Sequence, residues 1–246
     1  MPRLSARRGA APGHLPAEPA VFTCGGAGGG RCRVMITTAP DFSFEQAAFA
    51  RGARTVIGVD EVGRGPLAGP VTAAAVRLDP ARIPAGLNDS KKLGARRREA
   101  IYAELIEVAD VSVAHASVEE IDRINILAAS HLAMCRAIAG LPARADLALI
   151  DGNLLPKDLP CAGEAIIKGD ARSLSISAAS IAAKICRDRI MVDLAQQHPG
   201  YGWETNAGYG SKAHMEVLRN LGVTPHHRRS FKPVYNILYQ EKSVSD

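Results

Sequence analysis

The sequence predicts an α/β fold in which helices cover both faces of a sheet. Short runs rich in β-branched and other apolar residues alternate with longer stretches whose apolar residues recur at helical spacing. Glycine or proline bounds several of the short runs, as is common at strand ends. Strands that alternate with helices are typical of this class of fold. The 246 residues allow one large domain or two small ones, and no internal repeat is visible.

The expected strands are the short apolar runs. Their β-branched residues favour extended backbone, and the shortest runs suit strands that are buried on both faces. We expect strands over residues 55–59, 71–78, 111–118, 147–150 and 165–167.

The expected helices are longer and carry an apolar stripe. In the first of them, Ile101, Leu105 and Val108 share one face, as the helical repeat requires. The last ends at Gly222, because glycine commonly follows the final turn of a helix. We expect helices over residues 97–109, 119–141, 173–197 and 211–220.

Residues 1–40 differ in composition from the rest of the chain. They are rich in Gly, Ala, Pro and Arg, with too few large apolar residues to offset the entropy of ordering. We therefore expect a disordered N-terminal extension over 1–40 and a folded domain over 41–246. Met35 stands where compositional order begins, so a mis-assigned start codon explains the extension most simply, and an organelle transit peptide is the alternative.

The net charge of +5 belongs mostly to this extension. Residues 1–40 hold five arginines and one glutamate, or +4, which leaves 25 basic and 24 acidic side chains, or +1, for the other 206 residues. Basic residues still cluster at 91–98 and 228–232, which suits a face on a phosphate backbone. For residues 96–98, a solvated helix face is the favoured interpretation, and a phosphate contact is the alternative.

The cysteines and the apolar runs limit the class of protein. The five cysteines form no CxxC pair, which argues against a disulfide framework and against a zinc site. No apolar run reaches the roughly 18–20 residues of a membrane span. We therefore expect a cytoplasmic protein that is not inserted in a membrane.

Acidic residues follow three of the apolar runs. Asp60 and Glu61 follow the first, Asp151 ends the second, and Asp170 comes shortly after the third. Ligands collect at the carboxyl ends of strands in α/β sheets, so these carboxylates converge if the first and third runs lie near each other. Like charges 4 Å apart repel by roughly 4 kcal/mol at an effective dielectric constant of 20, so the cluster needs protons or cations. An all-oxygen set favours Mg²⁺ or Mn²⁺, and two such ions suit phosphodiester cleavage.

A structural interpretation of these acids stays open. An Asp after a strand is commonly a turn or helix-capping residue. Neighbouring residues on a regular strand point to opposite faces, so Asp60 and Glu61 can bind one metal only if the pleat is interrupted. We expect the following Gly63-Arg64-Gly65-Pro66 to interrupt it.

Six ordered motifs, spread over residues 55–234, resemble the ribonuclease HII family. They are Asp60-Glu61-Val62-Gly63-Arg64-Gly65-Pro66-Leu67-Ala68-Gly69-Pro70, Asp89-Ser90-Lys91-Lys92-Leu93, Leu149-Ile150-Asp151-Gly152-Asn153, Lys168-Gly169-Asp170, Ser177-Ala178-Ala179-Ser180-Ile181-Ala182-Ala183-Lys184 and His226-His227-Arg228-Arg229-Ser230-Phe231. The Gly-Arg-Gly form distinguishes the chain from the sister family, ribonuclease HIII.

This resemblance implies a ribonuclease H-like fold, with a mixed five-stranded sheet flanked by helices and a helical C-terminal part. It implies an endonuclease that cuts the RNA strand of RNA–DNA hybrids and cuts on the 5′ side of single ribonucleotides in duplex DNA, leaving 5′-phosphate and 3′-hydroxyl ends. It assigns Mg²⁺ or Mn²⁺ to Asp60, Glu61, Asp151 and Asp170, in a protein expected to act as a monomer. A nucleic-acid-binding protein that has lost catalysis and a small-molecule phosphatase are the rival interpretations.

The resemblance also implies residues that contact the substrate. The loop of Gly63, Arg64 and Gly65 reads the 2′-hydroxyl, and Tyr209 stacks on the sugar after the cut; the remaining backbone contacts are Lys91, Lys92, Ser180 and Lys184. The family often has lysine where this chain has Ala207, which puts one phosphate contact in doubt.

Other chemistries lack the residues they need. His226 and His227 have no third ligand at zinc spacing, and no G-x-S-x-G elbow for a nucleophilic serine occurs. Gly63-x-Gly65 lacks the further residues of a dinucleotide loop or a P-loop, so no nucleotide cofactor is expected.

Overall fold

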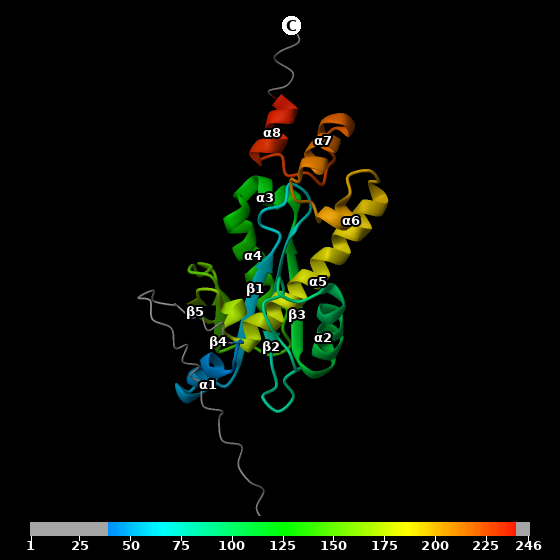
Figure 1. The fold of residues 1–246 in the computed structure, drawn as a ribbon. Coiled ribbons are helices and arrows are strands. Elements are labelled where there is room, and N and C mark those ends of the chain that lie inside the picture. The colour runs from blue at the N-terminus through cyan, green and yellow to red at the C-terminus, as the bar shows by residue number, and fades with distance from the viewer. Residues whose placement is uncertain (1–38, 240–246) are drawn as a thin grey trace, which may run out of the picture. The chain divides into compact units, whose positions relative to one another are not determined.

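The computed structural model describes residues 39–239, and within them a single five-stranded mixed sheet lies at the centre (Figure 1). The two antiparallel pairs are β1 with β2 and β2 with β3, and the two parallel pairs are β1 with β4 and β4 with β5. The strand order is β3-β2-β1-β4-β5. The strands are β1 (Val56–Val62), β2 (Val71–Arg77), β3 (Asp110–Ala116), β4 (Leu147–Asp151) and β5 (Ala162–Ile166).

Helices cover both faces of the sheet, as expected. The helix α4 (Ile126–Ala139) covers one face, where Ile57 and Val59 of β1 are fully buried in one cluster with its alanines. The helices α2 (Ala95–Val108) and α5 (Leu174–Gln197) cover the other face, packing on Ala74 and Val76 of β2. Figure 1 shows α5 crossing in front of the strands. The α/β fold and its mixed five-stranded sheet are therefore confirmed.

Gly58 lets α5 lie directly on β1. A Cβ atom at Gly58 would lie 2.0 Å from the carbonyl carbon of Ser175 and 2.3 Å from the amide nitrogen of Ile176. These are backbone atoms of the first turn of α5, so they cannot rotate away. The close approach explains why small residues crowd the start of this helix.

Gly58→Ala is therefore expected to destabilise the protein by at least about 3 kcal/mol, the upper end of the usual cost of overpacking a core. For a domain of this size that loss lowers the melting temperature by about 6 °C or more. Thermal unfolding of Gly94→Ala is the matched control, because a Cβ at Gly94 meets no atom within 4 Å. Equal melting temperatures for the two variants would show that α5 can shift away from β1.

The expected helix over 119–141 is wrong in one respect, because it is two helices. They are α3 (Val118–Ile124) and α4, separated by Asn125, whose φ of 68° is left-handed. The Asn125 side chain accepts a hydrogen bond from the Ala128 amide at 3.1 Å and so caps α4. The apolar spacing continues across the break, which hid it from a periodicity argument.

Strand β5 also lies earlier than the expected 165–167. It pairs only with β4, and its sequence Ala-Gly-Glu-Ala-Ile lacks the apolar signal of a central strand. Ile167, expected inside the strand, is 64% exposed. The other short elements that the apolar patterns did not indicate are α1 (Ser43–Ala50), the 3₁₀ helix η1 (Gly169–Ala171), α6 (Trp203–Asn206) and α8 (Lys232–Tyr239).

A helical C-terminal part gathers beyond one end of the sheet, as the family resemblance implies (Figure 1). It contains α6, α7 (Lys212–Leu221) and α8, and its core is built on the fully buried Trp203 and Leu218. Leu67 and Ala68, from the loop after β1, belong to the same core. The loop that follows the first two acids is therefore packed against the C-terminal helices.

Two buried histidines form a neutral hydrogen-bonded pair in this core. The Thr224 amide donates to Nδ1 of His227 at 3.0 Å, which leaves Nε2 of His227 as the donor to Nε2 of His214 at 3.3 Å. That His214 nitrogen also accepts from the indole nitrogen of Trp203 at 3.1 Å, so Nδ1 of His214 donates to the carbonyl of Tyr209. Burial, followed by repulsion from His214, lowers the pKa of His227 to about 3.

The stability of the protein is therefore expected to fall in mild acid. Below the ordinary histidine pKa of about 6.5 the unfolded chain takes up a proton that folded His227 refuses, and this continues until the pH nears 3. Between pH 8 and pH 5 the loss from His227 alone is about 2 kcal/mol, or about 4–8 °C in melting temperature. The His227→Gln variant should be less stable than the unaltered chain at pH 8, but its stability should fall less between pH 8 and pH 5. Parallel melting curves for both proteins across this range would contradict the assignment.

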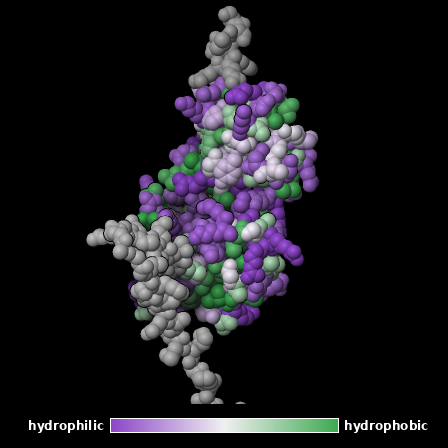
Figure 2. All heavy atoms as spheres, in the orientation of Figure 1, coloured by the Kyte–Doolittle hydropathy of each residue, from purple (hydrophilic) through white to green (hydrophobic). Residues whose placement is uncertain are grey.

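Residues 1–38 and 240–246 lie outside the described part of the chain. The extension expected to be disordered over 1–40, except for its last two residues, and the alternative start at Met35 therefore lie outside it too. Among residues 39–239 no helix is long and apolar enough to cross a membrane. Hydrophilic residues predominate on the face of Figure 2, with hydrophobic residues in scattered patches.

Candidate active site

The two adjacent acids of β1 lie in regular strand. Asp60 pairs with Ala74 and Glu61 with Ala73, and the ladder continues to Val62 before Gly63 takes a φ of 94°. The expected interruption of the pleat therefore comes too late to turn both acids to one face. Asp60 is buried on the α5 face, and Glu61 lines a cavity of about 160 Å³ together with Ser130 and Met134 of α4.

Asp151 connects the two faces at the carboxyl edge of the sheet. It is the last residue of β4, the parallel neighbour of β1, and it lines the same cavity as Glu61. Its Oδ1 accepts a hydrogen bond from the Gly169 amide at 2.7 Å. The first and third acid-bearing runs are not adjacent, because β4 lies between β1 and β5, and it is Asp151 at the end of β4 that lies between their acids.

Asp170 reaches the site from outside the sheet. Lys168, with a left-handed φ of 55°, turns the chain after β5, and η1 then carries Asp170. The Nζ of Lys91 lies 4.0 Å from Oδ2 of Asp170. The site thus combines two strand ends, one short helix and one loop.

The pKa values indicate that these carboxylates share one negative region. Burial raises the pKa of Asp60 well above its ordinary value, and Glu61 and Asp151 raise it further by repulsion. Burial also raises the pKa of Glu61, which the Arg64 guanidinium partly offsets, and the pKa of Asp170, where Asp151 adds repulsion. Such a set of carboxylate oxygens is chemically suited to a hard divalent cation.

The side chains of the four acids do not converge on one point in this structure. Within residues 39–239 no three of them are arranged to hold one ion as they stand. Each instead has a partner in the protein. The Glu61 amide donates to Asp60 at 2.7 Å, Arg64 to Glu61 at 3.2 Å and the Gly169 amide to Asp151, while Asp170 faces Lys91. Binding a cation with these acids would therefore require them to exchange these partners for the ion.

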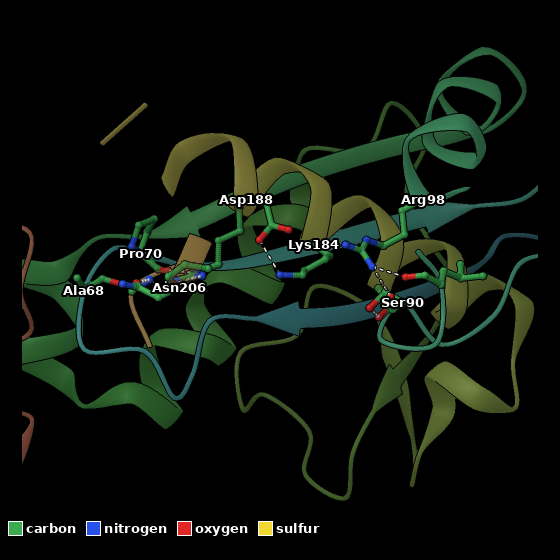
Figure 3. A network of polar contacts seen from close by, with 12 residues as sticks. Ala68, Pro70, Ser90, Arg98, Lys184, Asp188 and Asn206 are labelled. Atoms are coloured by element: carbon green, nitrogen blue, oxygen red, sulfur yellow. Dashed lines mark hydrogen bonds and ion pairs between the residues drawn. The ribbon is translucent and has the colours of Figure 1, made fainter. Parts of the chain in front are cut away.

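The loop that carries Lys91 and Lys92, residues 89–93, lies beside the acids. Lys91 and Lys92 are both exposed, and the charges on Asp170, Asp60 and Asp151 all act on Lys91. Arg98 of α2 fixes this loop by donating to the carbonyl oxygens of Ser90 and Leu93 (Figure 3). Arg98 thus stabilises the loop of residues 89–93. For Arg98, neither of the two interpretations of the basic run, a solvated helix face or a phosphate contact, agrees with these bonds.

Ser180 and Lys184 share a face of α5 but differ in exposure. Ser180 is buried, lies 2.9 Å from the Ser90 hydroxyl, and is close enough to Asp60 to lower its pKa. Lys184 is half-buried and donates to Asp188, one turn along, at 2.6 Å (Figure 3). Ser180 is therefore a buried neighbour of Asp60, whereas Lys184 lies nearer the surface.

The glycine loop and Tyr209 lie together although they are far apart in sequence. A Cβ at Gly65 would lie 3.4 Å from Cε1 of Tyr209. The Leu67 amide donates to the Gly208 carbonyl at 2.8 Å, which joins the two segments. Tyr209 is 48% exposed, so its ring is open to a ligand beside the loop. Ala207, which replaces the usual lysine, takes a left-handed φ of 48°.

Two buried arginines complete the site, and the sequence patterns missed both roles. Arg228 was expected in a basic cluster on the nucleic-acid face, and this is wrong because it is fully buried. Arg187 is also fully buried. One signal was available for it: Ala183, Arg187 and Met191 recur every four residues, which puts Arg187 on the buried stripe of α5.

Comparisons with known proteins identify relatives of this chain in sequence and in fold. A family model described as Ribonuclease HII matches residues 57–234. Ribonuclease HII of Cereibacter sphaeroides (strain ATCC 17025 / ATH 2.4.3) is 72% identical over 211 residues, covering 86% of this chain and 100% of that protein. The protein of the same name from Paracoccus denitrificans (strain Pd 1222) is 67% identical over 206 residues, covering 84% and 98%. The crystal structure of ribonuclease H2 from Pyrococcus horikoshii OT3 superposes with a TM-score of 0.66 at 28% identity, covering 78% of this chain and 100% of that one.

Proposed function

The chain belongs to the ribonuclease HII family, and on that basis we propose that it also incises duplex DNA at single embedded ribonucleotides. It is a ribonuclease H, which hydrolyses the RNA strand of RNA–DNA hybrids. The proposed cut lies on the 5′ side of the ribonucleotide and leaves 5′-phosphate and 3′-hydroxyl ends. The observation that carries the proposal is that the exposed ring of Tyr209 lies beside Gly65, which itself follows Asp60 and Glu61 by only a few residues. It supports a ribose-recognition surface directly beside the acids.

The proposed metal ligands are Asp60, Glu61, Asp151 and Asp170, with Mg²⁺ or Mn²⁺ as the ion. The family depends on divalent metals, and the raised pKa values of three of these acids support a cation that relieves their repulsion. When two such ions are bound, they activate a water molecule and stabilise the leaving oxygen of a phosphodiester. Lys91 offsets part of the negative charge and is exposed enough to reach a substrate phosphate.

The proposed substrate contacts surround these acids. Glycine allows a ligand to approach the backbone closely, so the loop Gly63-Arg64-Gly65 is suited to reading a 2′-hydroxyl, the group that separates RNA from DNA. The exposed ring of Tyr209 is suited to stacking on the neighbouring sugar. Further contacts to the nucleic-acid backbone are assigned to Lys91, Lys92, Ser180 and Lys184.

We propose that residues 41–246 form one catalytic domain that acts as a monomer in the cytoplasm. The three cysteines in the described residues are all unpaired, which supports a reducing compartment.

Cleavage of a DNA duplex with one embedded ribonucleotide tests the proposal. With Mg²⁺ or Mn²⁺, one cut on the 5′ side of the ribonucleotide is expected, and none with EDTA or with an all-DNA duplex of the same sequence. A chain that cuts a continuous hybrid but leaves the single ribonucleotide intact would refute the proposed activity. Binding of both duplexes without cleavage would identify a silent relative, and hydrolysis of small phosphate esters would point to a phosphatase.

A further inference from the structure

Arg187 and Arg228 are two fully buried cations. Arg187 lies on α5, and Arg228 lies between α7 and α8. In the part of the chain that the structure describes, no carboxylate lies within ion-pair distance of either guanidinium. Burial lowers the pKa of both, and repulsion from Arg187 contributes to lowering that of Arg228 to about 9. The guanidinium group is not deprotonated in proteins, so both side chains are cations. Apolar residues would often stabilise such a core equally well, which calls for another reason to retain the charges.

Backbone carbonyl oxygens take all the hydrogen bonds recorded for the two guanidiniums. Arg228 donates to the carbonyls of Gly63, Arg64 and Gly69 at 2.6, 3.0 and 3.0 Å. Arg187 donates to those of Ala68, Pro70 and Ala207 at 3.2, 3.0 and 3.0 Å. Five of these six carbonyls belong to the loop 63–70, and the sixth lies two residues before Tyr209. Figure 3 shows Ala68 and Pro70 close to Asn206, where the two segments meet.

The bonds to Arg228 determine which way two peptide groups face. In a trans peptide the C=O and N–H bonds point in opposite directions. Since the carbonyls of Gly63 and Arg64 point inward to the guanidinium, the N–H groups of Arg64 and Gly65 point away from it. Both residues are exposed, and neither N–H donates to another residue among 39–239. A cation on the carbonyl also polarises the peptide and strengthens the N–H as a donor.

The same arginines account for the two glycines of the loop. A Cβ at Gly63 would lie 2.2 Å from Nε of Arg187, and this side chain cannot move away because three carbonyls hold its guanidinium group. The φ of 94° at Gly63 also disfavours residues other than glycine. Gly65 instead lies against the Tyr209 ring. Gly63 therefore serves the packing of Arg187, and Gly65 serves the surface open to a ligand.

We propose that Arg228 is the positioning residue for ribose recognition, and that Arg187 ties the same loop to the segment of Tyr209. By holding the carbonyls inward, Arg228 presents the Arg64 and Gly65 N–H groups as a pair of donors for the oxygen of a 2′-hydroxyl. This inference rests on the proposed function, in which the loop reads that hydroxyl. Lysine cannot replace either residue, because its single ammonium group lacks the planar fork that reaches three carbonyls.

The test compares Arg228→Lys with the matched control Arg189→Lys, an exposed arginine of α5 that pairs with Glu99. For each protein, kcat and KM are measured on a single-ribonucleotide duplex and on a continuous hybrid, well below its melting temperature. The loss of kcat/KM in Arg228→Lys is expected to be about fivefold to tenfold larger on the single-ribonucleotide duplex than on the continuous hybrid, because one hydroxyl carries all the discrimination there. Arg189→Lys is expected to keep both activities. Equal losses on both substrates would show that Arg228 only maintains the fold.

A measurement on the unaltered chain keeps the inference testable if Arg228→Lys does not fold. In metal-free buffer, hydrogen exchange at the Arg64 and Gly65 amides is expected to slow when the single-ribonucleotide duplex binds and to change less with the all-DNA duplex. Equal protection by both duplexes would overturn the inference. Failure of the unaltered chain to cut at a single ribonucleotide would instead remove the proposed function, so the two failures are distinguishable.

Discussion

Asp151→Asn is expected to lower kcat on an RNA–DNA hybrid by at least about 10³, or about 4 kcal/mol of transition-state stabilisation. Asp151 ends β4 between the two acids of β1 and Asp170, and its charge acts on all three. Asparagine keeps the size of the side chain, and its amide oxygen can still accept from the Gly169 amide. The substitution therefore removes the ligand charge with little change in the local fold.

Three measurements make this result specific. The melting temperature and the affinity for the hybrid in metal-free buffer should stay close to those of the unaltered chain. Calorimetric titration with Mn²⁺ should show weakened binding. Asp193→Asn, an exposed carboxylate on α5, is the matched control and should keep full activity. Normal turnover of Asp151→Asn at saturating Mg²⁺ would remove this residue from the metal set.

Tyr209→Ala is expected to slow cleavage at a single embedded ribonucleotide by roughly tenfold or more, since loss of one stacked contact costs on the order of 1–3 kcal/mol. The ring lies against Gly65 and is half exposed, whereas the Tyr209 backbone is held by His214 and by the Asn206 carbonyl. Truncating the side chain therefore leaves the segment in place. The effect on a continuous hybrid should be smaller, because that substrate offers many 2′-hydroxyls.

Tyr209→Phe separates the ring from the hydroxyl group. It keeps the stacking surface and is expected to retain most of kcat/KM on both substrates. The comparison requires both variants on both duplexes at one salt concentration, because binding to nucleic acid depends on salt. Equal losses for the two variants would assign the role to the hydroxyl and reject stacking.

The local sequence pattern is sufficient for the two strands that carry Asp60, Glu61 and Asp151, but not for η1, which carries Asp170. Each of β1, β2 and β4 is a short apolar run whose burial follows from composition, and Asp151 ends β4 as expected. The long helix α5 begins at the residue after the Ser173 cap, one residue from the expected start. These features depend on neighbours within a few positions, so a single sequence contains the information.

The break at Asn125 and the edge strand β5 are not determined in this way. The apolar stripe continues through Asn125, so the pattern does not show the break. The left-handed conformation of Asn125 is evident only in the structure, where its side chain accepts the Ala128 amide and caps α4. For β5, pairing with β4 supplies what its weak apolar pattern does not. In both cases a long-range contact or a side-chain hydrogen bond outweighs local propensity.

By itself, the sequence determined the α/β class, and it marked the four acids and the loop of Gly63, Arg64 and Gly65 as the candidate site, because each carries a local pattern or an ordered motif. The tertiary structure alone decided that β4 separates β1 from β5, that Tyr209 meets Gly65, and that Arg228 turns inward. The physical reason is that a residue pattern reports whether a side chain is buried but not which distant segment buries it. An arginine in a basic run normally stays in water, and here the carbonyls of a loop some 160 residues away in sequence provide the hydrogen bonds that make its burial tolerable.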